Sequence, residues 1–310
     1  MNTAYRSLAL LVVATSLWGA SSALIARTAA TGFAAGAPVA AGGAVSLLLC
    51  AVAAGDNPVR AFRAGPGLFL RLGALEVVNL AFYVAALRIG PLPVVVALHL
   101  TAPVLIIATH IVRGMRALNL VVIVELVLVG AAICLVAGRP PAGTPAWQVL
   151  LACVLAVASA ASVALLIGLV ARESADHATL SAAGLQLLCA GVLGAPLLVL
   201  RPPSVVGATE LAVIGATLLG PGFACYWWAL RRLDATTAGI VGLNEAVVAS
   251  IIGTAVAGSH VTAATLLAGA LVLMAVGLEV RTTRASGAPP PRTPRMPRVV
   301  YPRWLFRLRY

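Results

Sequence analysis

The chain has 310 residues, of which 61% are hydrophobic and only 10% are charged, and its mean hydropathy is +1.04. A soluble domain carries roughly 25% charged residues, so this composition excludes an ordinary soluble protein. The net charge of +12 does not indicate nucleic-acid binding, because eight of the 21 arginines follow the last apolar stretch and no lysine is present. We therefore expect an all-α polytopic membrane protein.

Ten apolar stretches are long enough to cross about 30 Å of hydrocarbon as helices. They cover residues 8–26, 33–54, 68–87, 93–112, 119–138, 147–170, 178–200, 208–230, 236–257 and 262–280. A β-barrel would instead show alternating segments of about ten residues. A cleaved signal peptide at the first stretch would leave nine spans and disturb the internal pairing described next, so we expect that stretch to remain as the first span.

The sequence contains an internal repeat. Residues 82–105 align without gaps to residues 225–248, and six positions are identical, among them Tyr83/Tyr226 and Arg88/Arg231. Both segments cover the end of the third and most of the fourth span of their half. Because each half holds five spans, the second half must enter the membrane in the opposite orientation, which gives an inverted repeat typical of alternating-access transporters.

This repeat defines the expected organisation of the chain. Residues 1–140 form the first five-helix repeat, 141–280 the second, and 281–310 a basic, Pro- and Arg-rich tail. Arginines in the alternating loops divide 16 to 4 in favour of the side that holds both termini, so the positive-inside rule places both termini in the cytoplasm. Residues 139–146 and 201–207 are then expected outside.

Three segments together resemble a known family. They are "SLWGASS" (16–22), "NLAFYVAALRIGPLPVVVALHLTAPVL" (79–105) and the stretch from "YWWALRRLDATTAGIVGLNEAVV" to the Gly-containing last span (226–277). In order and spacing they are similar to the drug/metabolite transporter superfamily, in the form of a ten-span EamA-type transporter. Within that superfamily the first-half segment most resembles threonine/homoserine exporters.

The resemblance implies a secondary active transporter in the bacterial inner membrane. Such a protein would export a small polar metabolite such as an amino acid, with proton coupling as one means of drive. The chain departs from the family pattern in two places. The ninth-span Glu-Pro pair is Glu245-Ala246, and the later Gly-Glu is replaced by Gly258-Ser259-His260.

Glu245 is the main candidate for a translocation residue. An ionisable side chain at mid-membrane costs about 2.5–3.5 kcal/mol on insertion scales, so it usually has a function. Burial disfavours a charged carboxyl, which would poise Glu245 to take up and release protons. Its alternative role is that of a protonated hydrogen-bond partner for a neighbouring helix. Asn244 points roughly 100° away around the helix and is expected at the edge of the same cavity.

The third span carries a polar stripe. Glu76, Asn79 and Tyr83 follow i, i+3, i+7 spacing and share one helix face. Such a stripe must face protein or water rather than lipid. It therefore either lines a cavity or joins helices through hydrogen bonds, which contribute about 0.6 kcal/mol each.

The fourth span carries His99, Pro103 and His110 on one stripe. Pro103 leaves the carbonyl of His99 without its backbone donor, so we expect a loosened helix beside an imidazole that serves either as a substrate or proton site or as a hydrogen-bonded core residue. Trp18 lies too deep for an aromatic belt and either lines a cavity or packs on a neighbouring helix.

The remaining candidates are interpreted as structural. Tyr226, Trp227 and Trp228 lie at the cytoplasmic end of the eighth span, where aromatic residues anchor helices at the interface. Glu125 and Arg71 lie near span ends, from which their side chains can extend to water. The five cysteines lie in apolar runs without metal-ligand spacing, so we expect no metal and no cofactor.

Two other classes remain as alternatives to a transporter. An integral membrane enzyme would need a catalytic motif, and none is recognisable, so we expect no enzymatic activity. A channel would need a filter-like segment or a ring of charges. The expected partners are a small-molecule substrate and the lipid bilayer, with anionic lipids at the basic tail and no nucleic acid. The oligomeric state is open, with a monomer favoured.

Overall fold

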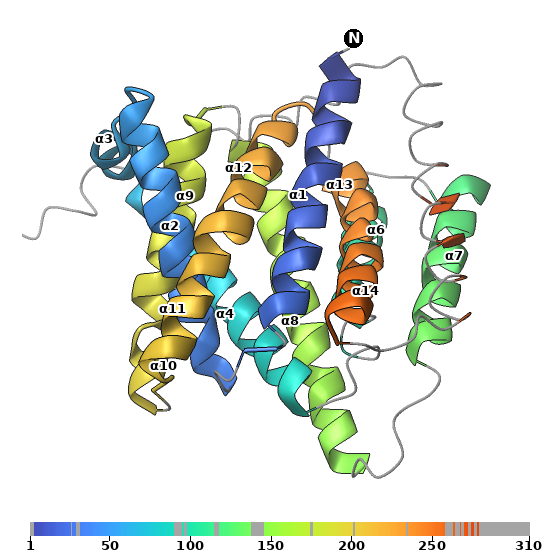
Figure 1. Ribbon diagram of the computed structural model, residues 1–310. Coiled ribbons are helices and arrows are strands. Elements are labelled where there is room, and N and C mark those ends of the chain that lie inside the picture. Colours follow the sequence, from blue (N-terminus) through green and yellow to red (C-terminus); the bar gives the residue numbers. More distant parts are fainter. Residues whose placement is uncertain are drawn as a thin grey trace, which may run out of the picture.

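The computed structural model describes residues 3–257 apart from 26, 29–31, 90–94, 96–97, 115–117, 138–145, 174–175, 201 and 234, together with isolated positions from 263 to 278. Within these residues the structure is helical and contains no strand (Figure 1). The tenth expected span is described only at isolated positions, and the expected tail, 281–310, lies outside the described residues. So do residues 258–260.

The helices follow the apolar stretches of the sequence. They are α1 (Thr3–Ile25), η1 (Gly32–Ala35), α2 (Gly36–Ala53), α3 (Pro58–Ala64), α4 (Pro66–Ile89), α6 (Ala102–Val112), α7 (Leu120–Ala137), α8 (Ala146–Glu173), α9 (Thr179–Gly194), α10 (Pro196–Leu200), α11 (Val205–Ile214), η2 (Gly215–Leu219), α12 (Gly220–Ala229), α13 (Ala235–Gly242) and α14 (Asn244–Ala257). Among the described residues, six helical segments are long and apolar enough to cross a membrane. The chain is thus an α-helical, multi-pass membrane protein, and the count of ten spans stays a prediction.

Several of the expected spans are divided rather than uniform α-helices. The seventh is split at Ala195 between α9 and α10, and three others are divided as follows. In the eighth span, α11 passes through the π-helical turn η2 into α12, next to Pro221, which has no backbone N–H to donate to the preceding turn. In the ninth, α13 ends at Gly242 and α14 begins at Asn244. In the fourth, α6 begins at Ala102, directly before Pro103, as the loosened helix predicted from that proline requires.

The short helix α3 was not expected from the sequence. It lies in a loop rich in Gly, Pro and Arg, but Asn57 accepts a hydrogen bond from the backbone N–H of Arg60 (2.9 Å) and Pro58 occupies the first turn. An Asn N-cap followed by a proline is a helix-start signal that hydropathy alone does not register.

The packing of the helices has a two-fold pattern. α2 packs along α9, and α6 packs along α13. The contact of α1 with α12 has a counterpart in the contact of α8 with α4, and the contact of α1 with α13 and α14 has one in the contact of α8 with α6. If each expected span of the first half is exchanged with its counterpart in the second half (the first with the sixth, the second with the seventh, and so on), this set of contacts is unchanged.

Close helix contacts depend on small residues. A Cβ atom at Gly42 of α2 would lie 1.9 Å from the carbonyl oxygen of Ala212, and one at Gly215 would lie 2.0 Å from that of Val39. α2 and the α11–η2 segment therefore approach each other backbone to backbone, in the manner of small-residue interfaces between membrane helices.

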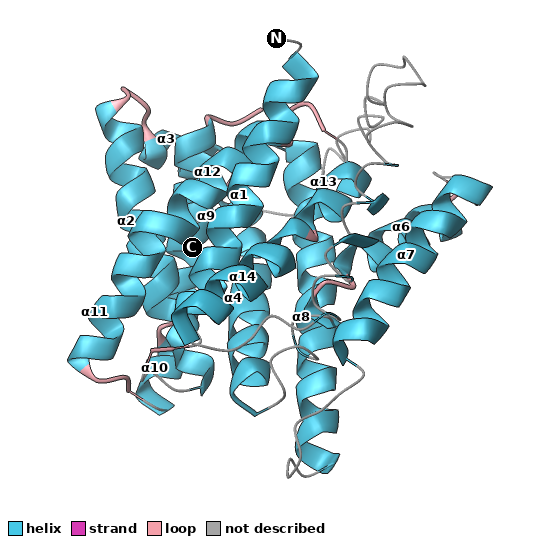
Figure 2. Cartoon of the chain, turned by 45° about the vertical axis from the view of Figure 1, so that its right-hand side comes forward, coloured by secondary structure: helices cyan, strands magenta, loops and turns pink. Residues whose placement is uncertain are grey.

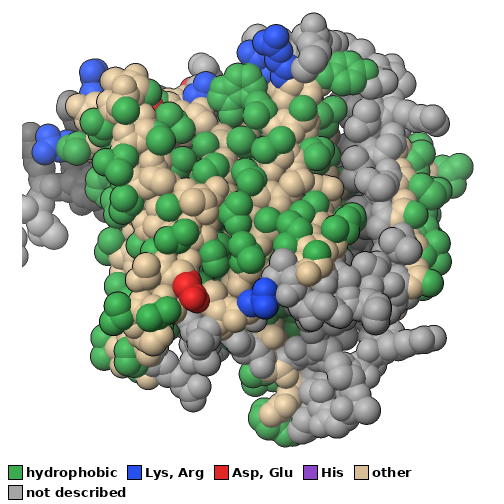
Figure 3. Space-filling model, in the orientation of Figure 1, with side chains coloured by type: hydrophobic (Ala, Val, Ile, Leu, Met, Phe, Trp, Pro, Cys, Tyr) green, Lys and Arg blue, Asp and Glu red, His purple; other side chains and the backbone are tan. Residues whose placement is uncertain are grey.

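The outer surface matches a lipid environment. Large apolar side chains on the outer faces of the helices are exposed, including Leu49, Leu150, Val192 and Val199. Figure 3 shows hydrophobic side chains over the lateral face, while most of the visible arginines gather at the end of the bundle that holds the N-terminus. α7 lies at the edge of the bundle in both orientations (Figures 1 and 2), where Val122 packs with Ile240 and Leu243.

Candidate functional site

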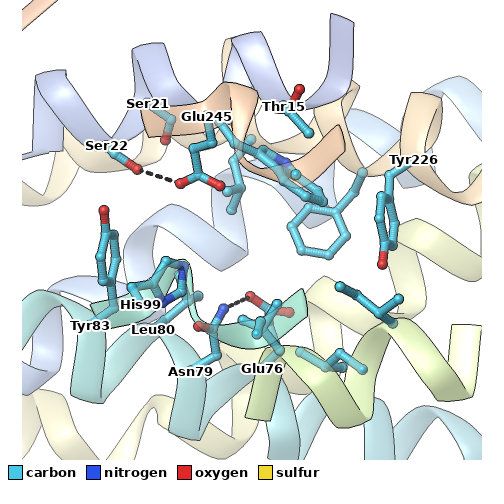
Figure 4. Close-up of a pocket in the computed structure, with 18 of the residues that line it drawn as sticks. Thr15, Ser21, Ser22, Glu76, Asn79, Leu80, Tyr83, His99, Tyr226 and Glu245 are labelled. Atoms are coloured by element: carbon cyan, nitrogen blue, oxygen red, sulfur yellow. Dashed lines mark hydrogen bonds between the residues drawn. The ribbon is translucent and has the colours of Figure 1, made fainter. Parts of the chain in front are cut away.

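A cavity of about 110 Å³ lies inside the bundle, between the two halves of the chain. It is lined by α1, α4, α6, α8, α9, η2, α12, α13 and α14, and by His99 just before α6. Figure 4 shows Ser22 and Glu245 on one side of it and Glu76, Asn79, Tyr83 and His99 on the other. The space is sufficient for several water molecules or a small organic molecule.

Glu245 enters the cavity from the first turn of α14, directly after the helix interruption. Its Oε1 accepts a hydrogen bond from the Ser22 hydroxyl (3.2 Å). The helix N-terminus also favours a negative charge at this position.

The position of Glu245 depends on a close helix contact. A Cβ atom at Gly19 of α1 would lie 2.5 Å from the Glu245 carbonyl oxygen and 2.9 Å from the Ala249 nitrogen. Gly19 therefore lets α1 and α14 approach closely enough for Ser22, one turn further along α1, to reach the Glu245 carboxylate.

Glu76 is held by amide donors on both of its carboxylate oxygens. Oε1 accepts from Nδ2 of Asn79 (3.1 Å) and Oε2 accepts from Nε2 of Gln186 (3.1 Å). The side-chain oxygen of Gln186 in turn accepts from the indole N–H of Trp227 (2.9 Å). Glu76 is only 1% exposed, and without these donors a buried carboxylate would be costly.

The network continues on the other side of Glu76. The Ser159 hydroxyl donates to Oδ1 of Asn79 (2.8 Å), so its oxygen accepts from Nδ1 of His99 (2.9 Å). His99 therefore carries a proton on Nδ1, which leaves Nε2 as an acceptor whenever the ring is neutral. Every donor in the chain from His99 and from Trp227 points toward Glu76, whose two carboxylate oxygens are the final acceptors.

Aromatic rings form two walls of the cavity. Trp18 packs against Phe223 and Tyr226, each at a centroid distance of 5.0 Å. Tyr83 lies against His99 at 4.1 Å. Within the described residues, the Trp18 indole N–H and the Tyr226 hydroxyl have no hydrogen-bond partner. The Trp18 nitrogen lies against Gly222 of α12, so the Tyr226 hydroxyl is the one of the two left for a ligand.

The charge of the cavity is negative whenever its acids are ionised. Glu76 and Glu245 are near enough to interact electrostatically, and no arginine is among the lining residues. Chemically the site can bind and release protons at two carboxylates and can bind a cation between aromatic walls. Among the described residues, no three His, Cys, Asp or Glu side chains gather to hold a metal ion.

The structure brings most of the candidate residues together. Six of them line the cavity: Trp18, Glu76, Asn79, Tyr83, His99 and Glu245. Asn244 does not line it: its amide instead donates to the hydroxyls of Thr15 and Ser16 (3.0 Å each) and ties α14 to α1. His99 and Glu245 are each hydrogen-bonded to a serine rather than to each other.

Some interpretations from the sequence were wrong. Tyr226 and Trp227 are buried rather than placed in an interfacial belt, because Tyr226 lines the cavity and Trp227 bonds to Gln186. Trp228 is 38% exposed, which fits an outward position. Glu125 is fully buried and does not extend to water.

The remaining sequence-based interpretations concern Arg71, the cysteines and the residues near the two family motifs. Arg71 is exposed, and its Nε donates to the Gly67 carbonyl (2.9 Å) at the start of its own helix, as expected near a span end. Cys50 and Cys134 are exposed on the outer surface rather than buried. The side chains of Pro103, His110 and Ala246 lie outside the described residues.

Three residues of the site were missed by sequence reasoning. Ser22, Ser159 and Gln186 each hold a candidate side chain in place. Serine is common in membrane helices and gives no signal alone. Gln186 is a polar residue inside an apolar span, and this isolated position was the one available signal.

Comparison with known proteins bears on the second half of the chain. Residues 148–280 match the EamA-like transporter family. The match starts in α8 and covers less than half of the chain. It supports the resemblance to the drug/metabolite transporter superfamily, while the threonine/homoserine exporter subgroup stays a prediction.

The fold has counterparts among solved structures. Twenty-four chains match, and one described as "Crystal structure of protein" has a TM-score of 0.70 at 19% identity, with 90% of this chain and 98% of that chain covered. At this identity the likeness shows the fold alone. No curated protein matches the sequence at a significant level.

Proposed function

We propose that the protein is a secondary active transporter, with the cavity between its two halves as the substrate site. The observation that carries this proposal is that the two halves contribute equivalent positions to one cavity. At the offset of 143 residues, five pairs have both members in the lining: Glu76/Leu219, Leu80/Phe223, Tyr83/Tyr226, His99/Gly242 and Ala102/Glu245.

The interrupted helices agree with this pattern. The break before α6 at 100–101 and the break at Leu243 fall at equivalent positions of the fourth span in each half. Discontinuous helices near the membrane centre form the substrate and ion sites of many inverted-repeat transporters. Together with the two-fold packing, these breaks support two inverted five-helix repeats, 1–140 and 141–280, that exchange an outward-facing and an inward-facing arrangement.

The carboxylates supply a means of coupling. Counting about 1.5 Å per residue, Glu76 and Glu245 each lie roughly 15 Å into their spans. A carboxyl at this depth that is exposed in turn to each side can carry a proton across. Glu245 is the better candidate, because Glu76 has both oxygens engaged by amides while Glu245 has only Ser22.

The setting follows from the resemblance. The protein would reside in the bacterial inner membrane with both termini in the cytoplasm and would export a small polar metabolite such as an amino acid. The basic tail would bind anionic lipid of the inner leaflet, each arginine contributing about 1 kcal/mol.

Counterflow in proteoliposomes tests the transporter proposal. Vesicles loaded with unlabelled solute are diluted into trace labelled solute, using a panel of amino acids and organic amines. A carrier accumulates label transiently, and the accumulation is absent from protein-free vesicles. Label that only equilibrates would indicate a channel, and a chemically altered solute would indicate an enzyme. Either result contradicts the proposal.

A further inference from the structure

The cavity is built for one sign of charge. Its lining carries two carboxylates, Glu76 and Glu245, and no arginine, and the sequence has no lysine. A buried charge is stable only when it is paired or well hydrogen-bonded. An anionic ligand would find no arginine or lysine here and would face two acids, whereas a cation would find two carboxylates as partners.

The two carboxylates are not equally available to a ligand. Glu76 accepts an amide hydrogen bond on each oxygen, so its acceptors are largely engaged by the protein. Glu245 accepts one hydrogen bond, from Ser22 to Oε1, and its Oε2 has none from the described residues. An ammonium group entering the cavity therefore has its best acceptor in Oε2 of Glu245.

The remaining walls are apolar and aromatic. Trp18, Phe223 and Tyr226 form one aromatic cluster, and Ile25, Leu166 and Ile167 add aliphatic surface. Aromatic faces attract organic cations, and aliphatic walls favour a ligand with an apolar body. The unpartnered Tyr226 hydroxyl, in a side chain that is 95% buried, leaves one polar contact for the ligand.

We infer that the cavity takes a small apolar amine in its cationic form, with the ammonium at Glu245 and the apolar body against Trp18 and Phe223. This inference rests on the proposed function, because it names the substrate class of the same site. It also separates amines from free amino acids, two classes of solute between which the resemblance to exporters does not decide. A free amino acid brings a carboxylate, and the cavity has no arginine or lysine to pair with it, whereas the corresponding amine brings no carboxylate.

A charge series on one carbon skeleton tests the inference. The probes are 2-phenylethylamine (a cation), phenylalanine (a zwitterion) and 3-phenylpropionate (an anion), measured by calorimetric titration of the purified full chain at neutral pH. We expect 2-phenylethylamine to bind at least about tenfold more tightly than phenylalanine, since a charge-assisted hydrogen bond contributes roughly that factor or more, and 3-phenylpropionate not to bind. Phenylalanine binding as tightly as the amine, or no binding of any probe, would overturn it.

Variants locate the ammonium. Glu245→Gln should lose about tenfold or more in affinity for 2-phenylethylamine, while Glu210→Gln, a matched change at an exposed glutamate of α11, should retain it. Unchanged amine affinity in Glu245→Gln would overturn the assignment, and the wild-type series stands as a test even if that variant does not fold. Counterflow of phenylalanine without amine binding would refute the inference and leave the transporter intact, whereas amine binding without counterflow would refute the transporter.

Discussion

Glu76 and Glu245 are both carboxylates in an apolar bundle, but the structure stabilises them in different ways. Glu76 is the acceptor at the centre of a hydrogen-bond chain that runs from His99 to Trp227, and its partners are neutral amides. Glu245 has one hydroxyl donor and the N-terminus of α14. Removing the charge should therefore have different consequences at the two positions.

Glu76→Gln should destabilise the protein. The new amide nitrogen must face the amide nitrogen of Asn79 or of Gln186, so one hydrogen bond is lost whichever way the side chain turns. An unsatisfied buried donor costs about 1–3 kcal/mol, and we expect a lower midpoint of thermal unfolding in detergent. Glu210→Gln should leave the midpoint unchanged. Equal midpoints for both variants would contradict the proposed role of Glu76 as acceptor.

Ser159→Ala tests the other arm of the network. It removes the acceptor for Nδ1 of His99 and the donor to Oδ1 of Asn79 together. Ser162→Ala, one turn along α8, removes only a local bond to the Ala158 carbonyl. We expect a stability loss of about 1–3 kcal/mol for Ser159→Ala and a smaller one for Ser162→Ala, measured by chemical denaturation. A larger stability loss for Ser162→Ala than for Ser159→Ala would show that the hydrogen bonds of Ser159 to His99 and Asn79 do not stabilise the fold.

Sequence reasoning at this scale identified the charged and aromatic members of the site but not their supports. An acid or imidazole inside an apolar span is conspicuous because its burial is costly. The serines that hold Glu245 and His99 look like ordinary small residues of membrane helices. Trp227 was misread because a tryptophan near a span end can face either lipid headgroups or the protein, and only its contact with Gln186 decides.

At the scale of elements, the interruptions of the helices matter more than their ends. Hydropathy predicts where a span lies, but it does not detect a break within it, since the residues on both sides of the break are equally apolar. Pro103 was an exception, because a missing backbone donor has a local signature. The break at Leu243 has no such residue, and it places Glu245 in the first turn of α14.

Gly19→Ala should separate α1 from α14. The added Cβ would lie 2.5 Å from the Glu245 carbonyl oxygen, so the helices must move apart and the bond between Ser22 and Glu245 lengthens. Gly168→Ala on α8 is the matched control, because nothing lies within 4 Å of its Cβ position. We expect Gly19→Ala alone to lower both thermal stability and amine binding. Normal binding in this variant would contradict the role given to the close contact.

At the scale of the whole molecule, the described helices pack in a two-fold pattern, and the inverted repeat of two five-span halves stays a prediction. What the sequence could not supply is which helix faces meet. The polar stripe of α4 correctly predicted that this face of the helix lines the cavity. The contribution of α9 through Gln186 was not predicted, because α9 lies outside the two repeated segments.

The orientation in the membrane has a direct test. Residues 138–145 lie outside the described residues, and the arginine distribution predicts that the loop 139–146 faces away from the cytoplasm. A cysteine introduced at Thr144, in a background with the native cysteines replaced, should react with a membrane-impermeant maleimide in intact cells. Labelling that needs a membrane-permeant reagent would reverse the topology.

Uphill transport by Glu245→Gln tests the central claim most directly. The substitution keeps size and hydrogen bonding but removes the titratable proton. In proteoliposomes, with the solute concentration raised to offset the roughly tenfold weaker binding expected without the Glu245 charge, we expect the variant to retain exchange of a solute that the wild type transports. It should lose accumulation of that solute against a gradient when a proton gradient is imposed. Loss of accumulation with exchange intact is the predicted result. A variant that still concentrates the solute as the wild type does would contradict proton coupling at Glu245.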